Sequence, residues 1–342
     1  MIYFERLSLR NWRNFKNAAV ALRPRVFLIG PNSSGKSNLL DVFRFLRDIS
    51  SKGLQQAIRI RGNLSSIRCL GATGYSKIDL EAVISDEEHH WRYILVLGQD
   101  NNSIPFVVKE SVFHDDKEIL TRPGDADRAD RERLRQTALE QVSLNREFRP
   151  LASFFETVSY QHLVPQVIRD PAGFTATQVE NDPFGRDFLM RVWKTGKKTR
   201  DSRLRKLHKA LQAAVPQLEY LKAEQDEIGR PHLLAGWKNW RKEPTGQRED
   251  QFSDGTLRLL GLLWSCFEGT GPLLLEEPEL SLHPAVIREL PKMFNRINRA
   301  RKQDARQIII STHSEELLSD PGIGPDEVLR LDPGEHETQI LG

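Results

Sequence analysis

Hydrophobic and polar residues alternate in two parts of the N-terminal third of the chain. The first part is residues 2–9, where apolar side chains such as Phe4 and Leu7 are interleaved with polar ones. The second is residues 78–84, and a further strand-like segment follows at residues 90–97. A period of two places apolar side chains on one face of a strand. These segments therefore predict half-buried strands of an antiparallel sheet beside a main sheet.

Short, continuous apolar runs predict fully buried strands of a second kind. They cover residues 25–29, 272–275, 307–310 and 328–331. Apolar residues at helical spacing lie between these runs, and they predict helices over residues 34–47, over residues 255–267 and after Pro284. Strands that alternate with helices at both ends of the chain indicate an α/β nucleotide-binding core.

The middle of the chain differs from both ends. Residues 121–214 are rich in charge and helical in pattern, with the clearest helices expected at 128–147 and 202–214, and residues 243–249 are expected to form a loop. We therefore predict that an N-terminal half of the core (1–120) and a C-terminal half (251–342) are separated by a mainly helical insertion lobe (121–250).

Composition and charge narrow the class of protein. The 342 residues carry a net charge of +3, which permits nucleic-acid binding without arguing for it. The two cysteines, Cys69 and Cys266, have no metal-ligand spacing and suit a reduced compartment. No apolar run is long enough to span a membrane, and the charged N-terminus does not suit a signal peptide. We expect a cytoplasmic protein without a membrane partner.

A complete phosphate-binding loop follows the apolar run at residues 25–29. It matches G-x-x-x-x-G-K-[ST] and is made of Gly30, Pro31, Asn32, Ser33, Ser34, Gly35, Lys36 and Ser37, with Asn38 next to it. The glycines permit a tight turn whose backbone N–H groups converge on phosphate oxygens, and the following helix adds its positive N-terminal end. Lys36 is expected to reach the β- and γ-phosphates of ATP, and the Ser37 hydroxyl to ligate Mg²⁺.

Two adjacent acids follow the apolar run at residues 272–275, at the edge of an α/β sheet where ligands bind. By position, Glu276 is assigned to the metal and Glu277 to the attacking water, as the group that orients or deprotonates it. A solvated Glu-Glu turn at the end of a strand is the alternative.

Two further segments are candidates for γ-phosphate contacts. Ser253, Asp254, Gly255 and Thr256 start the helix before the acidic strand, where Ser253 or Asp254 is also a natural N-cap without any function. His313 follows the apolar run at residues 307–310, at the same expected edge of the sheet. A surface or core histidine is the alternative for this residue.

The order of these elements resembles that of the ABC-type ATPases. Within them the chain is similar to the soluble branch of RecF, SMC and OLD-family proteins, and above all to the stand-alone bacterial "AAA family ATPases" known as AAA_21. The resemblance implies a P-loop NTPase core with an antiparallel β subdomain, to which the helical lobe is added. It identifies residues 30–37 as Walker A, 253–256 as the signature, 279–284 as the D-loop and His313 as the switch histidine.

This chain departs from the family pattern at several positions. The signature reads S-D-G-T where transporters have S-G-G-Q, and Glu276 stands where most relatives have aspartate. The Q-loop is not placed, and Gln161 and Gln166 are both candidates for it.

In this family the signature of one protomer completes the ATP site of the other, so the resemblance implies a homodimer around ATP and Mg²⁺. It also favours a bacterial anti-phage or toxin-like system with a separate effector, a nuclease or a toxin-like protein, because little chain follows the last expected strand. The alternative is a RecF-like repair ATPase that binds DNA. Its support is the basic stretch at residues 191–209, which is also typical of a solvated helix face. A transporter subunit is disfavoured by the insertion and by the signature.

Overall fold

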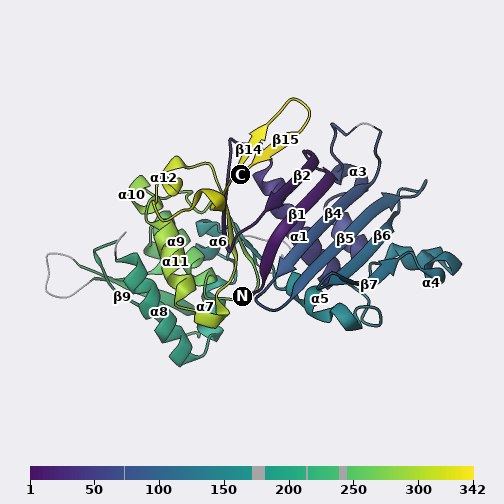
Figure 1. Ribbon diagram of the computed structural model, residues 1–342. Coiled ribbons are helices and arrows are strands. Elements are labelled where there is room, and N and C mark those ends of the chain that lie inside the picture. Colours follow the sequence, from purple (N-terminus) through teal and green to yellow (C-terminus); the bar gives the residue numbers. More distant parts are fainter. Residues whose placement is uncertain (73, 172–181, 213–214, 239–244) are drawn as a thin grey trace.

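A six-stranded, mostly parallel sheet forms the centre of the computed structural model, which describes residues 1–72, 74–171, 182–212, 215–238 and 245–342 (Figure 1). Its strand order is β15-β14-β3-β13-β12-β8. The bounds are β3 (Arg25–Ile29), β8 (Ser159–Gln161), β12 (Leu273–Glu276), β13 (Ile308–Thr312), β14 (Val328–Pro333) and β15 (Thr338–Leu341). All neighbouring strands are parallel except β15, so the carboxyl ends of β3, β13, β12 and β8 share one edge.

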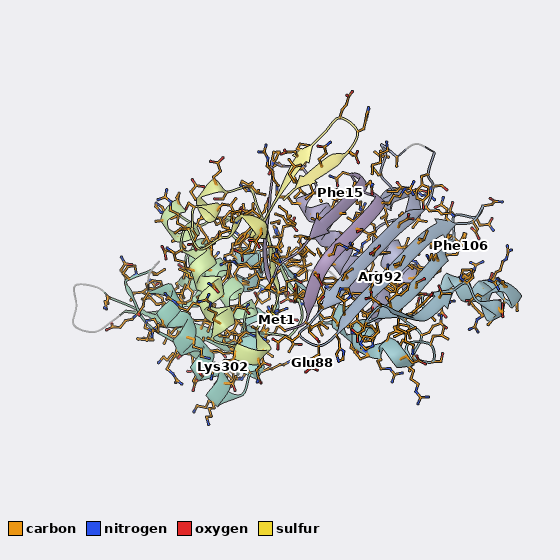
Figure 2. All side chains as sticks on the ribbon, viewed as in Figure 1. Met1, Phe15, Glu88, Arg92, Phe106 and Lys302 are labelled. Carbon is orange, nitrogen blue, oxygen red and sulfur yellow. The ribbon has the colours of Figure 1, made fainter. Side chains whose placement is uncertain are left out.

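A six-stranded antiparallel sheet in the order β2-β1-β4-β5-β6-β7 lies beside the central sheet, as the alternating segments predict. Its strands are β1 (Tyr3–Trp12), β2 (Phe15–Ala21), β4 (Ile78–Ser85), β5 (His90–Gln99), β6 (Pro105–His114) and β7 (Lys117–Arg122). Figure 2 shows Phe106 near the outer end of this sheet and Lys302 on the opposite, helical side of the protein.

The central sheet is buried on both faces, which explains why its strands are apolar without alternation. Val26 and Leu28 pack into a core with the antiparallel sheet, α1 (Lys36–Lys52) and α5 (Arg149–Glu156). The side chain between them, Phe27, packs into a second core with α8 (Lys197–Leu211), α9 (Asp254–Ser265) and α11 (Leu290–Arg299). Successive side chains of a strand point to opposite faces, so each core receives every second residue. The mixed α/β fold predicted from the sequence is therefore confirmed.

Shorter elements complete the fold. The helices are α2 (Leu54–Arg59), α3 (Leu64–Ile67), α4 (Asp125–Ala129), α6 (Pro165–Arg169), α7 (Phe188–Lys194), α10 (Pro284–Ile287) and α12 (Glu315–Leu318). Short 3₁₀ turns are η1 (Arg131–Arg135), η2 (Arg146–Phe148), η3 (Glu249–Gln251), η4 (Lys302–Asp304) and η5 (Pro325–Glu327). A small antiparallel sheet, β11-β10-β9, consists of β9 (Leu218–Gln225), β10 (Pro231–Trp237) and β11 (Thr245–Arg248).

The prediction of a long helix at residues 128–147 is wrong. Only the end of α4, the 3₁₀ turn η1 and the start of η2 form there, and turns lie between η1 and η2. A buried carboxylate captures a backbone N–H group that a helix would use, because Glu110 of β6 accepts from the backbone N–H of Ala138 at 2.8 Å. Arg122 in turn donates to the Gln136 carbonyl oxygen at 3.0 Å. These tertiary hydrogen bonds outweigh the helical pattern of the segment.

Helix α8 and strand β11 lie in the second half of the middle segment. The helix expected at residues 202–214 exists as α8, although residues 213–214 lie outside the described part of the chain. The loop expected at residues 243–249 is wrong where it is described, because 245–248 form β11 and η3 begins at Glu249. The segment 121–250 also supplies a strand, β8, to the central sheet.

Candidate active site

The loop at residues 30–37 connects β3 to α1, and the turn between β1 and β2 holds it in place. Gly35 has φ +96°, a conformation that favours glycine, and a Cβ there would lie 2.0 Å from Asn14 Nδ2. Asn14 donates from Nδ2 to the Ser34 carbonyl oxygen at 3.2 Å, and it accepts from Asn38 Nδ2 at 2.8 Å. The Asn14 side chain therefore holds the loop by binding the backbone carbonyl oxygen of Ser34.

The C-terminal strand β15 supports the same loop from the other end of the sequence. Thr338 donates its hydroxyl hydrogen to the Ser34 carbonyl oxygen at 3.0 Å, and its backbone N–H donates to the Asn14 carbonyl oxygen at 2.8 Å. The Asn14 amide also contacts the Thr338 hydroxyl. Residues more than 300 positions apart thus hold one turn. The sequence analysis identified neither Asn14 nor Thr338 as a support of this loop.

Lys36 is buried and donates from Nζ to the carbonyl oxygens of Gly30 and Pro31 at 2.7 and 3.0 Å. Burial lowers the pKa of this lysine, while the nearby carboxylates of Glu277, Glu279 and Glu276 oppose that shift. The Lys36 ammonium group therefore lies inside the loop, where it binds two carbonyl oxygens that phosphate oxygens can replace.

Glu276 ends β12 and faces the loop. Its carboxylate contacts the Ser37 hydroxyl on one oxygen and the Tyr160 hydroxyl of β8 on the other. Burial, and then the hydrogen bond to Glu276, raise the pKa of the Tyr160 hydroxyl above its usual value, so Tyr160 remains a hydrogen-bond donor. The structure brings the two predicted metal ligands, Ser37 and Glu276, together. Tyr160, which orients the carboxylate, was missed by the sequence analysis.

Glu277 has φ +45°, which is uncommon for a residue with a side chain and is typical of functional sites. Its backbone is held on both sides, since its N–H donates to the Ser311 carbonyl oxygen at 2.9 Å and its carbonyl oxygen accepts from Arg258 at 3.1 Å. His313 Nδ1 lies 3.5 Å from Glu277 Oε1 and also 3.5 Å from Glu279 Oε1. The two predicted catalytic side chains are therefore neighbours.

Glu279 is a further acid of this site. Only 4% of its surface is exposed. Its Oε1 accepts from the Thr312 hydroxyl at 2.6 Å and from the His313 backbone N–H at 3.1 Å. The carboxylate thus ties the segment after β12 to the end of β13. From the sequence it was assigned only to the D-loop, although its position two residues after Glu277 is a signal for this second role.

Of the two Q-loop candidates, Gln161 lies at the carboxyl end of β8, beside β12. It is 3% exposed, and its Oε1 has no hydrogen-bond partner in the described structure. Gln166 lies on α6 and donates to Asp254 at 2.8 Å. The edge of the sheet that carries the phosphate loop therefore includes Gln161.

The segment Ser253–Thr256 makes its contacts elsewhere. The exposed Ser253 caps α9 by accepting from the Thr256 N–H at 3.2 Å. Asp254 is held by Arg169 and Gln166 of α6, at 2.7 and 2.8 Å. A Cβ on Gly255 would lie 2.7 Å from the Ser281 carbonyl oxygen. The side-chain partners of Ser253 and Asp254 thus lie on α6 and α9, and not on the loop at residues 30–37.

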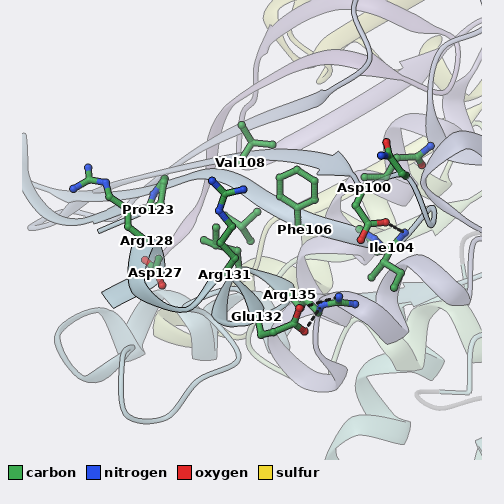
Figure 3. A pocket seen from close by; sticks show the side chains of 15 residues that line it. Asp100, Ile104, Phe106, Val108, Pro123, Asp127, Arg128, Arg131, Glu132 and Arg135 are labelled. Carbon is green, nitrogen blue, oxygen red and sulfur yellow. Dashed lines mark hydrogen bonds and ion pairs between the residues drawn. The ribbon is translucent and has the colours of Figure 1, made fainter. Parts of the chain in front are cut away.

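A cavity of about 620 Å³ lies apart from this site, between the antiparallel sheet and the segment of α4 and η1 (Figure 3). Phe106 and Val108 line it on one side, and Arg131, Glu132 and Arg135 line it on the other. None of the side chains assigned above to the candidate active site lines this cavity. In the described part of the chain, no helix is both long enough and apolar enough to cross a membrane.

Comparisons with known proteins show the family and the fold of the chain. The model of the AAA_21 family, described as "AAA domain, putative AbiEii toxin, Type IV TA system", matches residues 25–319. An Smc head bound to the C-winged helix domain of ScpA is similar with a TM-score of 0.58, at 13% identity over 99% of this chain and 97% of that one. None of the curated proteins matches the chain.

Two further solved structures have the same fold. The SMC head domain from Thermotoga maritima has a TM-score of 0.54 at 11% identity, over 99% of this chain and 98% of that one. An Smc head domain with an extended coiled coil from Pyrococcus furiosus, bound to the C-terminal domain of ScpA, has a TM-score of 0.53 at 13% identity, over 100% and 96% of the two chains.

Proposed function

This chain belongs to the AAA_21 family and is an ABC-type ATPase, and from this premise we propose that it works as a dimer in which the partner chain completes each active site. The observation that carries the proposal is the division of the predicted site residues. Walker A, both acids and His313 converge at one edge of the sheet, whereas Ser253 and Asp254 make their contacts on α6 and α9.

Mg²⁺ fits the set of residues that converges at the edge of the sheet. The Ser37 hydroxyl and the Glu276 carboxylate are hard oxygen ligands, which Mg²⁺ prefers, and they already face each other. When bound with ATP, Mg²⁺ neutralises charge on the phosphates. Tyr160 holds the far oxygen of Glu276, so the carboxylate keeps its orientation. Ser37 and Glu276 are the proposed ligands of the ion.

The remaining residues have separate roles in the proposed mechanism. Lys36 exchanges its bonds to the carbonyl oxygens of Gly30 and Pro31 for phosphate oxygens. Glu277 orients the attacking water and accepts its proton. His313 lies against the Glu277 carboxylate and donates toward the γ-phosphate, and Glu279 fixes the backbone of His313.

The signature of the partner chain supplies the remaining contacts to ATP. Ser253 is exposed at the N-terminus of α9, a helix of 12 residues, where its oxygen caps the Thr256 N–H. Its hydroxyl hydrogen and the backbone N–H groups of Asp254 and Gly255 are proposed to face a phosphate. Arg169 and Gln166 turn the Asp254 carboxylate toward α6. The acid in S-D-G-T therefore does not repel the nucleotide.

The rate of ATP hydrolysis per chain is expected to depend on protein concentration. If two chains form each site, the rate per chain rises as monomers associate and levels off when all chains are dimeric. Hydrolysis measured over a dilution series, together with the molar mass in solution with ATP, checks this. A rate per chain that stays constant while the protein is monomeric contradicts a shared site.

As to the biological role, the proposal is an ATP-driven switch of a toxin-like or anti-phage system that acts with a separate nuclease or toxin-like effector. The family's description as a putative AbiEii toxin of a type IV system supports this setting. The neighbouring gene discriminates between roles, since a toxin or nuclease gene agrees with this proposal and replication genes agree with a repair role.

A second candidate role is DNA binding in the manner of a RecF-like ATPase, and one surface favours it. A pocket of about 400 Å³ between α8 and the end of α11 is lined by Lys198, Arg203, Lys206 and Arg301, with Asp304 as its one acid. Not every cation of the basic stretch at residues 191–209 is available to bind DNA. Arg200 is buried against Trp193, and Arg191 pairs with Glu268 at 3.2 Å.

Neutralising the five cations Lys197, Lys198, Arg203, Arg205 and Lys206 is expected to weaken DNA binding and to flatten its salt dependence. Each lost phosphate contact removes about 0.9 from the slope of log affinity against log salt for duplex DNA. Filter binding of duplex DNA at several salt concentrations measures that slope. As a matched control, neutralising the exposed Lys109 and Lys117 of the antiparallel sheet leaves it unchanged. Wild-type protein without DNA affinity at low salt removes this candidate role.

A further inference from the structure

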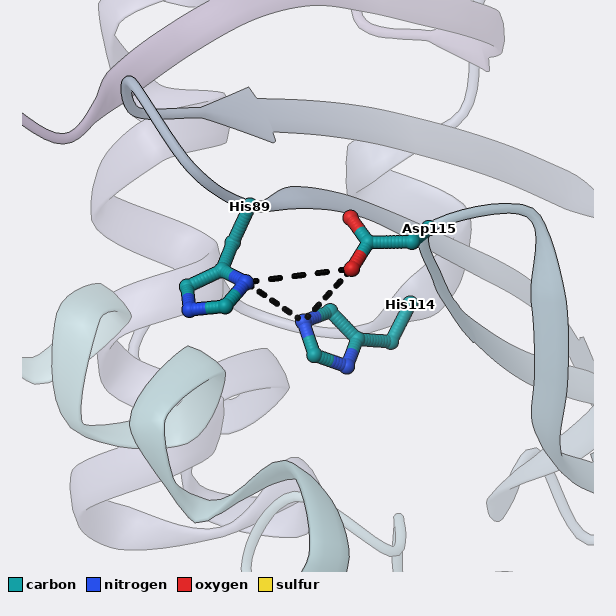
Figure 4. Close-up of side chains that lie close together, drawn as sticks. All are labelled: His89, His114 and Asp115. Atoms are coloured by element: carbon teal, nitrogen blue, oxygen red, sulfur yellow. Dashed lines mark hydrogen bonds and ion pairs between the residues drawn. The ribbon is translucent and has the colours of Figure 1, made fainter.

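Three potential metal ligands meet at two neighbouring turns of the antiparallel sheet, away from the ATP site (Figure 4). His89 comes from the turn between β4 and β5, His114 is the last residue of β6, and Asp115 follows it in the turn to β7. His114 Nε2 lies 3.3 Å from His89 Nδ1 and 3.5 Å from Asp115 Oδ2. His89 Nδ1 lies 3.7 Å from the same carboxylate oxygen.

These separations match the edges of a metal coordination shell. Zinc binds histidine nitrogen and carboxylate oxygen at about 2.0–2.2 Å, so two ligand atoms of a tetrahedral site lie roughly 3.3–3.6 Å apart. Two of the observed distances, 3.3 and 3.5 Å, fall within this range, and the third, 3.7 Å, lies just above it. One ion could therefore contact all three atoms after shifts of a few tenths of an ångström.

Contacts around the cluster hold each ligand in this arrangement. Asp115 Oδ1 accepts from the His90 backbone N–H at 2.9 Å, which leaves Oδ2 to face the histidines. The backbone N–H of His89 donates to Asp86 at 2.8 Å. The ring of His114 stacks on Trp91 with centroids 3.9 Å apart and planes at 11°. The ligands are thus oriented before any ion arrives, which lowers the entropy cost of binding.

We infer that His89, His114 and Asp115 form a binding site for a divalent transition-metal ion of the zinc class, with a fourth position open to solvent. Two imidazoles and one carboxylate suit Zn²⁺ better than Mg²⁺ or Ca²⁺, which prefer oxygen ligands. A bound ion would join the β4–β5 hairpin to the β6–β7 hairpin and so stabilise this end of the antiparallel sheet. The inference does not depend on the proposed dimer.

The competing explanation is a hydrogen-bonded trio without an ion, in which one histidine donates to the other and to Asp115. Both explanations predict the same distances, but only one predicts specific binding of a metal. Co²⁺ is a suitable probe, because its visible spectrum reports a site with nitrogen and oxygen ligands and it takes zinc positions. The full chain is titrated without nucleotide and with excess Mg²⁺, which occupies oxygen sites such as that of Ser37 and Glu276.

The expected result is one Co²⁺ per chain, displaced by Zn²⁺. His89→Ala and, separately, His114→Ala raise the dissociation constant by about 100-fold or more, because each removes a ligand. His90→Ala is the matched control, since its ring lies 3.4 Å from Glu5 and takes no part in the cluster, and it leaves affinity unchanged. Zn²⁺ raises the melting temperature of the wild type and of His90→Ala only.

His89 is half exposed, so its replacement is not expected to disturb the fold, and unchanged ATP hydrolysis by His89→Ala verifies this. His114→Ala also loses the stacking on Trp91 and serves as the second variant. Failure of the wild type to bind Co²⁺ or Zn²⁺ overturns the inference in favour of the hydrogen-bonded trio. Equal affinity in the wild type and His89→Ala overturns it in favour of a site elsewhere.

Discussion

Glu277→Gln is expected to bind ATP as the wild type does and to lower its hydrolysis by at least about 100-fold. Glutamine has nearly the same shape as glutamate but cannot accept the proton of the attacking water. The backbone of residue 277 is held by Ser311 and Arg258, so the substitution should leave the turn intact. Because ATP is bound but not cleaved, the variant is expected to accumulate as an ATP-bound dimer.

Size-exclusion chromatography with ATP and Mg²⁺, together with a phosphate-release assay, measures both effects. Glu276→Gln is the matched comparison, because it changes the neighbouring acid, which faces Ser37 and Tyr160. That variant should lose Mg²⁺-dependent ATP binding and should not trap a dimer. If instead Glu276→Gln traps the dimer and Glu277→Gln hydrolyses normally, the two assigned roles are reversed.

Ser253→Asp is expected to abolish ATP hydrolysis by changing the signature, which is the half of each site that the partner chain supplies. Aspartate is as good an N-cap as serine, so α9 should stay intact. Its negative charge, however, would face the γ-phosphate across the dimer. Repulsion between two unit charges 4 Å apart near a protein surface is about 4 kcal/mol. The expected loss of activity is therefore on the order of 100-fold or more.

Ser253→Asn is the matched control for that charge. Asparagine also caps the helix but is neutral, so this variant should retain far more activity than Ser253→Asp. A substitution of Gly255 would be a poorer choice, since its Cβ would lie 2.7 Å from the Ser281 carbonyl oxygen and would disturb the segment 279–284. Measuring the rate of ATP hydrolysis by the two Ser253 variants separates the effect of the added charge from the effect of helix capping. Equal activity in both variants would contradict the proposed contact between Ser253 and the γ-phosphate of the partner's site.

Local sequence signals predicted those parts of the fold and site that local physics determines. The apolar run at β3, the glycines of the loop and the helical spacing of α1 are contiguous, so one segment specifies the turn and its flanks. The strands β1, β4 and β5 were recognised because one face of each is buried against the core. The same reasoning placed Glu276 and His313 at one edge of a parallel sheet.

Residues that act through distant contacts could not be found in this way. Thr338 and Asn14 meet at the phosphate loop only because β15 and the β1–β2 turn converge there. Tyr160 reaches Glu276 only because β8, from the middle of the chain, pairs with β12. Likewise, the helix expected at residues 128–147 fails because Glu110, on β6, takes up the N–H of Ala138. Each case depends on a tertiary pairing that no periodicity encodes.

The central claim, an ATP site shared by two chains, can be tested by mixing two inactive variants. Lys36→Ala removes the cation that neutralises the β- and γ-phosphates, and Ser253→Asp blocks the signature. In a mixed dimer one composite site carries both changes. The other site combines an intact Lys36 with an intact Ser253 and is chemically whole.

The measurement is the rate of phosphate release after the variants, each with a different affinity tag, have exchanged subunits. Pull-down through one tag confirms exchange, and a Lys36→Ala chain mixed with itself gives the background rate. Mixing wild type with the Lys36→Ala, Ser253→Asp double variant gives the rate of a dimer with one lesion in each site. A shared site predicts that hydrolysis returns on mixing, to as much as half of the wild-type rate per mixed dimer. The shared site would be contradicted if mixed dimers form but remain as inactive as each variant alone. That result counts when wild-type dimers with one site blocked by a non-hydrolysable analogue still hydrolyse ATP at the other site.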